Sequence, residues 1–463
     1  MARILVVSNE SGMGLGGVPV FNKLLTEGLA ANPNHKVDLL YVTNANEKQD
    51  HGAATVHTVP PVEGENKMKT ILDAAKRDPQ EFGLPARGEN QYDIVIGHSR
   101  FSGPAASAMQ SAWYPDAVHM NFLHTSPEKL EQAKITKPDD AEMVRIRTEA
   151  GLAKVKIEKD ILRTAHVGVG VGGSLAADVR RIQAMNEGAK NWHDLMPGGE
   201  TVKTFSPPSP KEQFNVLLMG RMSDPMKGGG DALAAVKHLN DNGRKVHLTI
   251  RGADQATLQA TQDEAAELAG GADRVTVKPF TKEKQDLVDD MHTNHVVIMP
   301  SKTEGFGLVA TEAAAHCIPI LVNRDSGAAA FLQDPDRGAA HLGKNSVVIT
   351  PDDTSQRHIA WANAISDVQD NWVDRKIGAH ELHDVLKGYT WENAGTALVE
   401  AGMTARDGTT RGSKQVQSGE VQYVANAASL TSPNATTGQS GHTQPPAART
   451  QGSPQPTVKP AVL

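Results

Sequence analysis

Short apolar runs alternate with helical patterns through most of this chain of 463 residues. An apolar run between two helical patterns is typical of a parallel strand that is covered on both faces. Repeated units of this kind favour α/β architecture with parallel sheets. Because 463 residues are too many for one ordinary core, we expect two domains with appendages.

Two series of strands are predicted. The first comprises Ile4–Val7, Val37–Val42, Ile94–Gly97, Val118–Leu123 and Val167–Val171. The second comprises Asn215–Met219, Val246–Ile250, Arg274–Val277, Val296–Met299 and Ile318–Val322. Helices predicted between them include Val18–Ala30, Met68–Arg77, Gly230–Leu239, Gln255–Leu268 and a long one from about Asp140 to Leu162. Two doubly wound halves would place a site in a cleft, where the carboxyl ends of the strands converge.

The domain boundaries follow from composition. Residues 197–213 contain four prolines and few apolar residues, and so predict a linker between an N-terminal domain, 1–196, and a C-terminal domain, 214–388. Residues 389–406 predict a last helix. In residues 407–463 polar and small residues dominate, with too few apolar groups to offset an ordering cost of about 1–2 kcal/mol per residue. We therefore expect this tail to be disordered and not to pack on the domains.

Bulk composition excludes several classes of protein. A net charge of -7 argues against a nucleic-acid binder, which normally has a basic field. No stretch approaches the roughly 18–20 apolar residues that span a bilayer, and Met1–Ser8 predicts a buried first strand rather than a signal sequence. The single cysteine, Cys317, excludes an internal disulfide framework and a cysteine metal cluster. A cytoplasmic location is expected.

The most informative motif follows the apolar run Val296–Met299. Two glycines come next, and a helix is expected from about Leu308 onward. Glycines let the backbone approach a ligand, and a helix start offers free N–H groups to phosphate. Two carboxylates in the same segment suit vicinal hydroxyl groups. The segment thus predicts a site for an anionic ligand with sugar hydroxyls, with the candidate residues Glu304, Gly305, Phe306, Gly307, Leu308 and Glu312.

Two cations follow the first strand of the second series. Arg221 and Lys227 lie on one strand-to-helix loop next to a glycine run. Arginine binds phosphate bidentately and lysine supplies a mobile point charge, so the pair suits a diphosphate. Their position at a strand end that matches that of Glu304 favours this interpretation over two solvated loop cations.

A glycine-rich loop follows the first strand. Gly12, Gly14 and Gly17 formally satisfy the G-x-G-x-x-G fingerprint of dinucleotide folds, which leaves an NAD-type oxidoreductase as an alternative. However, Gly12 comes late for the tight turn, and the acid expected at the end of the second strand is missing, since Asp38 lies near its start.

Two histidines end predicted strands. His98 and His124 fall at strand carboxyl ends, where catalytic and binding groups gather in such sheets, although a structural role is the common one. The pair His292 and His295 lacks an apparent third ligand. The D-x-D of Asp334-Pro-Asp336 lies away from both predicted phosphate loops, so no metal is expected.

These motifs together resemble the retaining GT-B glycosyltransferases of the family 4 type. The two glutamates separated by seven residues and the run Arg-x-x-Asp-x-x-Lys-Gly from Arg221 carry the resemblance, and Tyr389-Thr-Trp-Glu392 is similar to the segment that opens the last helix of the family. In that family this helix crosses back onto the first domain. Cys317 departs from the pattern, because a glycine is usual there.

The resemblance implies a GT-B fold and transfer of a hexose-type sugar from a UDP- or GDP-sugar, with retention and without a metal or other cofactor. Arg221, Lys227, Glu304 and His124 would be catalytic, with both cations on the diphosphate, Glu304 on the sugar hydroxyls and His124 near the donor sugar. Glu312 would hold the ribose, and the closest loop contacts of the donor would be Gly16 and Gly17. His98 would lie on the side of the acceptor, which the sequence does not identify. A non-catalytic sugar-nucleotide-binding protein is a further alternative.

Overall fold

The computed structural model describes most of the chain. One compact unit spans Met1–Ala427 and contains two parallel sheets. The described residues are 1–14, 16–89, 91–137, 139–186, 190–200, 202–222, 224–408 and 412–416, with the backbone of 421–424.

The first sheet has nine strands in the order β15-β14-β7-β6-β5-β4-β1-β2-β3. All its neighbouring strands are parallel except β14 and β15, which are antiparallel. The strands are β1 Ala2–Ser8, β2 His35–Val42, β3 Thr55–Val59, β4 Ile94–His98, β5 Val118–Leu123, β6 Val167–Val171, β7 Asn191–Leu195, β14 Gly412–Gln415 and β15 Val421–Val424. Several of these strands are buried along their whole length, as expected between two layers of helices.

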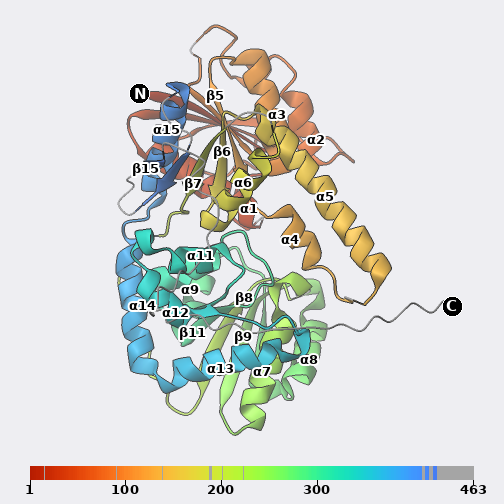
Figure 1. Ribbon diagram of the computed structural model, residues 1–463, viewed down its shortest axis with the longest axis vertical. Helices are drawn as coiled ribbons and strands as arrows, with labels where there is room; N and C mark the ends of the chain where they lie inside the picture. Colours follow the sequence, from red (N-terminus) through yellow and green to blue (C-terminus); the bar gives the residue numbers. More distant parts are fainter. Residues whose placement is uncertain are drawn as a thin grey trace, which may run out of the picture. The chain divides into compact units, whose positions relative to one another are not determined.

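The helices among the described residues that accompany this sheet are α1 Gly17–Ala31, α2 Lys67–Ala74, α3 Ser99–Trp113, α4 Pro127–Gln132, α5 Ala141–Thr164, α6 Gly173–Gln183 and α15 Trp391–Arg406 (Figure 1). Although α15 follows the second sheet in the sequence, it packs against α1. A Cβ atom placed on Gly28 of α1 would lie 2.2 Å from the carbonyl oxygen of Trp391. The buried face of α15 includes Ala394 and Leu398, which lie at the helical spacing of an amphipathic element.

The second sheet has six parallel strands in the order β10-β9-β8-β11-β12-β13. They are β8 Phe214–Met219, β9 Val246–Ala253, β10 Val275–Pro279, β11 Val296–Met299, β12 Ile320–Asn323 and β13 Val347–Val348. The accompanying helices are α7 Gly229–Asp241, α8 Leu258–Ala269, α9 Lys284–Thr293, α10 Leu308–Ala315, α11 Gly327–Gln333, α12 Ala340–Ser346, α13 Arg357–Asp370 and α14 Trp372–Leu386.

Both sheets confirm the predicted α/β class with doubly wound parallel sheets. Each sheet starts at an inner strand, and its strand order reverses between β1 and β4 or between β8 and β11. Ligands bind outside the strand ends at such reversals. The glycine-rich loop follows β1, the Arg221 loop follows β8 and the Glu304 turn follows β11, so the three predicted ligand loops lie at the two reversal points.

The chain passes from the first sheet to the second between Leu195, the end of β7, and Phe214, the start of β8. The described part of the predicted linker between these residues contains an isolated bridge from Gly199 to Thr390, the residue that caps α15. The division into separate domains at residues 196 and 214 stays a prediction. Within the described part of the chain, none of the helices combines the length and apolarity that crossing a bilayer requires.

The prediction that residues from Asp407 onward do not pack is wrong for residues 412–416. β14 pairs in parallel with β7, and Ser413, Gln415 and Val416 are buried. The composition argument failed because it counts apolar side chains, whereas backbone pairing and polar contacts hold this strand. Ser413 Oγ lies 2.9 Å from His193 Nδ1, and Gln415 Oε1 accepts a hydrogen bond of 3.0 Å from the backbone N–H of Met196. Residues 409–411, 417–420 and 425–463 of the predicted tail lie outside the described residues.

A chain that ends at Gly408 is therefore expected to melt at a lower temperature than one that ends at Ala427. The shorter chain loses β14 and leaves β7 as an open edge. A few lost hydrogen bonds at about 1 kcal/mol each amount to roughly 3 kcal/mol, enough to move the melting temperature by several degrees. Calorimetry on both chains beside the full-length protein checks this. Identical melting curves of the two truncated chains would contradict the packing of β14.

Candidate functional site

The turn between β11 and α10 has the geometry that its glycines predict. We call residues 304–307 the donor turn. Gly307 is the N-cap of α10 and has φ 94°, a left-handed conformation that favours glycine. A Cβ atom on Gly305 would lie 2.1 Å from the carbonyl oxygen of His124, so only glycine fits there. The turn thus lies against the end of β5, and α10 begins at Leu308 as the sequence predicts.

Lys227 and Glu304 form an ion pair, with Lys227 Nζ 2.7 Å from Glu304 Oε2. Both side chains are partly exposed, at 30% and 23%. Lys227 ends a short 3-10 helix, Pro225–Lys227, whose start is capped by Asp224, because the Asp224 side chain accepts a hydrogen bond from Met226 N–H. The structure thus brings together two predicted catalytic residues from the two ligand loops of the second sheet. A cation beside the start of α10 suits a bound diphosphate.

Arg221 lies on the same loop as Lys227 but is much more exposed. Its side chain is 74% exposed, and its guanidinium is 3.9 Å from Asp224 Oδ2. At this distance and exposure the ion pair holds the side chain only weakly. Arg221 is therefore a cation with the freedom to turn toward a ligand, rather than one fixed in the Lys227–Glu304 pair.

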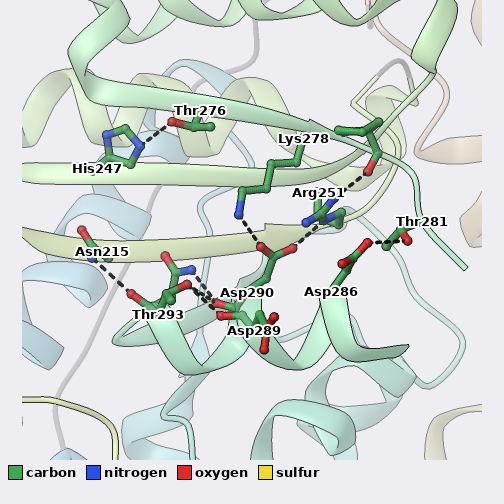
Figure 2. Close-up of polar contacts among 12 residues, drawn as sticks. Asn215, His247, Arg251, Thr276, Lys278, Thr281, Asp286, Asp289, Asp290 and Thr293 are labelled. Atoms are coloured by element: carbon green, nitrogen blue, oxygen red, sulfur yellow. Dashed lines mark hydrogen bonds and ion pairs between the residues drawn. The ribbon is translucent and has the colours of Figure 1, made fainter. Parts of the chain in front are cut away.

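Two other cations at the strand ends already have a carboxylate partner. Figure 2 shows Arg251 from β9 and Lys278 from β10 on the two carboxylate oxygens of Asp290 in α9. The distances are 2.5 Å from Arg251 Nε and 2.6 Å from Lys278 Nζ, and Asp290 is 1% exposed. These contacts hold α9 against the sheet. Arg251 and Lys278 consequently have less freedom to bind a diphosphate than Arg221.

Glu312 lies in α10, one turn after the start of the helix, and is half-buried. Burial in first place, and the carboxylate of Glu200 in second, raise the pKa of its carboxyl to about 7, against the opposing effect of Lys284. Glu200 belongs to the predicted linker, and its Oε2 is 2.6 Å from Lys284 Nζ. A carboxyl with a pKa near neutrality accepts hydrogen bonds from hydroxyl groups fully only when it is ionised.

His98 and His124 lie together, which the sequence did not predict. His98 Nδ1 is 2.9 Å from His124 Nε2, and both rings are buried. Burial lowers the pKa of His98 to about 3 and holds the pKa of His124 well below its usual value, so both imidazoles are neutral. His98 is fully buried against His124, and its place on the side of the acceptor stays a prediction.

The residue between β4 and α3 carries backbone strain. Ser99 has φ 45°, which is uncommon for a residue with a side chain. Its hydroxyl donates to the carbonyl of Phe122 at 3.0 Å and accepts from the backbone N–H of His124 at 3.2 Å. These bonds tie the ends of β4 and β5 together and so fix the two histidines. Strain of this kind is found where a site is held in one conformation.

The glycine-rich loop ends at α1. Gly16 is the N-cap with φ 108°, Gly17 opens the helix, and a Cβ atom on either residue would meet no atom within 4 Å. Both residues are exposed, and their contact with a ligand stays a prediction. A Cβ atom on Gly14 would lie 2.6 Å from Cγ of Lys282, and one on Gly12 would lie 2.5 Å from the side chain of Gln49.

The dinucleotide fingerprint is not supported by its surroundings. β1 ends at Ser8 and α1 begins at Gly17, so the loop between them is no tight turn. Asp38 lies inside β2, where its carboxylate binds His57 Nε2 at 3.2 Å and the hydroxyl of Tyr92 at 2.8 Å. That carboxylate is thus held in the interior and is not offered to a ribose.

The histidines and aspartates weighed as metal ligands have other partners. His292 Nε2 lies 3.0 Å from His316 Nδ1, and His295 Nδ1 accepts the backbone N–H of Asn215. Asp334 and Asp336 both pair with Lys414. Among the described residues there is no group of three or more histidine, cysteine or acidic side chains with the arrangement of a metal site.

Sequence reasoning missed several residues beside the site. They are Lys282, whose side chain lies against Gly14, Glu200 and Lys284 near Glu312, and Gly172, whose Cβ position lies 2.8 Å from the ring of Phe306. Nothing in the sequence marked the two lysines or Glu200 as site residues, since a charged residue in a site cannot be distinguished there from one on the solvated surface. Gly172 follows a predicted strand directly and could have been found as the counterpart of the other strand-end glycines.

Comparison with known proteins places this geometry in a family. The model of the family described as "Family 4 Glycosyltransferase in conflict systems" matches residues 5–398. A D-inositol 3-phosphate glycosyltransferase from Xylanimonas cellulosilytica is 25% identical over 341 residues, which cover 68% of this chain and 72% of that protein.

Two solved structures are similar over nearly the same span. Sucrose-phosphate synthase from Thermosynechococcus elongatus has a TM-score of 0.63 at 18% identity, covering 88% of this chain and 99% of that one. Anabaena HepE, solved in complex with UDP and glucose, has a TM-score of 0.58 at 13% identity, covering 87% and 100%. These likenesses confirm the predicted GT-B fold. Since the family model covers most of its length, the chain belongs to the family 4 glycosyltransferases of conflict systems.

Proposed function

We propose that this glycosyltransferase moves a hexose-type sugar from a UDP- or GDP-sugar to an acceptor hydroxyl with retention of configuration, and that it does so without a metal. The observation that carries the proposal is the Lys227–Glu304 ion pair, 2.7 Å long, in front of the start of α10. It places a cation for phosphate beside a carboxylate for sugar hydroxyls. The UDP and glucose bound to Anabaena HepE support the same class of donor.

Departure of the nucleoside diphosphate is the difficult part of such a transfer. The bond between the anomeric carbon and the diphosphate oxygen breaks while negative charge grows on the leaving group. Lys227, Arg221 and the N–H groups at the start of α10 would stabilise this charge. Glu304 would bind the sugar hydroxyls, and Glu312 those of the ribose.

Retention requires attack on the face that the leaving group vacates. The acceptor hydroxyl oxygen forms the new bond to the anomeric carbon on that face, and its proton passes to the departing diphosphate. We assign His124 to the vicinity of the donor sugar, where Nδ1, the nitrogen of its neutral imidazole that does not bind His98, would donate or accept one hydrogen bond. The buried partner His98 would fix the orientation of that ring.

The first experiment is calorimetric titration with UDP, GDP and NAD, followed by mass spectrometry of the corresponding sugar nucleotides with and without a chelator. D-inositol 3-phosphate is the first acceptor to try, because a similar protein is named for it. Binding of UDP or GDP with turnover that resists chelation supports the proposal. Binding of NAD alone would favour the oxidoreductase, and nucleotide binding without turnover would favour a non-catalytic protein. The anomeric proton coupling of the product tests retention.

Replacing the two cations should remove transfer while leaving the fold intact. We expect Arg221→Ala and Lys227→Ala each to lower kcat by about 10²–10³-fold, since each removes a charge from the leaving group. The melting temperature should change little for Arg221→Ala, because that side chain is 74% exposed. Lys237→Ala is the matched control, since Lys237 pairs with Asp241 on the surface of α7. Near-normal turnover in the double variant would defeat the assignment.

The affinity for the sugar nucleotide should depend on pH through Glu312. Its pKa is about 7, so the carboxylate is present above that pH and is lost as the pH falls through it. Well below pH 7 we expect the dissociation constant to rise by about tenfold for each pH unit. The rise ends when the dissociation constant reaches the value of a complex that lacks this one charge-assisted hydrogen bond. Glu312→Gln should bind more weakly at pH 8 and show a flat profile between pH 6 and 8. An unchanged slope in this variant would assign the titration to another group.

A further inference from the structure

Strand β14 makes an ionic contact with the part of the chain that forms the second sheet. Lys414 of β14 places its Nζ 2.6 Å from Asp334 Oδ2 and 3.0 Å from Asp336 Oδ2. The side chain of Lys414 is 19% exposed, as is that of Asp334, so solvent screens this pair only in part. The D-x-D segment thus binds an ammonium group of the chain itself.

A buried arginine reinforces this contact from the other side. Arg337 is 2% exposed, and its guanidinium lies 2.7 Å from Asp194 Oδ2 on β7 and 3.5 Å from Asp334 Oδ2. β7 is also the strand to which β14 pairs, with Lys414 opposite Asp194. Asp334 therefore receives one cation from β14 and one that is anchored on β7. Removing one partner of such a buried network is costly, because it leaves charge without compensation.

Asp334 is also the residue that ends α11. The helix spans Gly327–Gln333, with Asp334 as its C-cap, and Phe331 and Leu332 are buried in the core. It is short and packed, and so behaves as a rigid element. A displacement at its C-terminal end is transmitted to its start.

The start of α11 lies on the donor turn. The backbone N–H of Ala328 donates to the carbonyl of Phe306 at 2.8 Å. A Cβ atom on Gly327 would lie 2.3 Å from the carbonyl oxygen of Gly305. Glu304 forms an isolated parallel bridge with Ser326, the N-cap of α11. All three contacts reach the turn that carries Glu304 and leads into α10.

We propose that Lys414 is a positioning residue for the donor turn, acting through Asp334 and α11. This rests on the proposed function, in which Glu304 holds the transferred sugar. Lys414 touches neither donor nor acceptor. It holds one end of α11 on the edge of the first sheet, so that the other end presses the turn against the carbonyl of His124.

The position of the turn should matter for the sugar more than for the nucleotide. Glu304 lies in the turn, whereas Glu312 lies beyond the first turn of α10, within the electrostatic influence of Glu200 and Lys284. In Lys414→Ala, Asp334 and Asp336 lose the shared cation and α11 gains freedom at its C-terminal end. A displacement of about 1 Å at the reacting sugar costs up to 10²-fold in rate. Nucleotide binding should be affected far less.

The kinetic test compares Lys414→Ala and Lys414→Arg with the unchanged protein and with Lys237→Ala. Active sites are counted by nucleotide titration, so that a loss of folded protein does not count as a loss of rate. We expect Lys414→Ala to lower kcat by about 10–10²-fold, with the nucleotide dissociation constant within about twofold. Lys414→Arg should restore most of the rate, because a guanidinium pairs with both carboxylates. A fall in melting temperature with unchanged kcat per active site would overturn the proposal.

Hydrogen exchange gives a readout that does not need turnover. Amides of residues 304–310 and 327–333 should exchange faster in Lys414→Ala than in the unchanged protein, while those of α7 should not change. If no sugar nucleotide is turned over but these amides respond, the proposed function fails and the mechanical link stands. Faster exchange confined to β14 and β7 would show that Lys414 only holds the strand, and would overturn the positioning role.

Discussion

The donor turn depends on one close approach between backbone atoms. Gly305 lies so near the carbonyl of His124 that a side chain at this position would overlap it, with a Cβ atom at 2.1 Å. On the other side, the start of α11 lies against the same turn, with the Gly327 Cβ position 2.3 Å from the carbonyl of Gly305. The turn is thus held between an element of the first sheet and an element of the second. The start of α10 and the Lys227–Glu304 pair are positioned by this placement, and the His98–His124 pair lies beside it.

The segment around this contact could be predicted because several local signals agree there. β11 begins and ends at the predicted residues, Val296 and Met299, and α10 begins at Leu308, since an apolar run, glycines and a helix start occur in sequence. Charge pairing was a different matter. Lys227 and Glu304 were both named, but nothing in the sequence says that their side chains meet 2.7 Å apart. To predict this contact, one must know that the loop after β8 and the loop after β11 lie side by side.

The strand β14 shows where reasoning from composition fails. Ser413, Lys414 and Gln415 have the polarity of a solvated segment, yet Ser413 and Gln415 are buried. Their stabilisation comes from pairing with β7 and from specific partners such as His193 and Met196, which are more than two hundred positions away in the sequence. Periodicity within the segment has no information on partners so distant. The same limit hid the contacts of Glu200 with the Glu312 region.

The pairing of β14 with β7 and of α15 with α1 has a consequence for synthesis. The first sheet receives strand β14 and helix α15 from residues 391–415, which are made after the whole of the second sheet. Until then the edge of β7 exposes unpaired N–H and C=O groups, and the face of α1 that Trp391 covers is open. Domains fold from the N-terminus during synthesis, and exposed strand edges and apolar faces favour aggregation until they are covered. The first sheet is therefore completed only after the second sheet has been made, and the edge of β7 stays open until residues 412–415 are made.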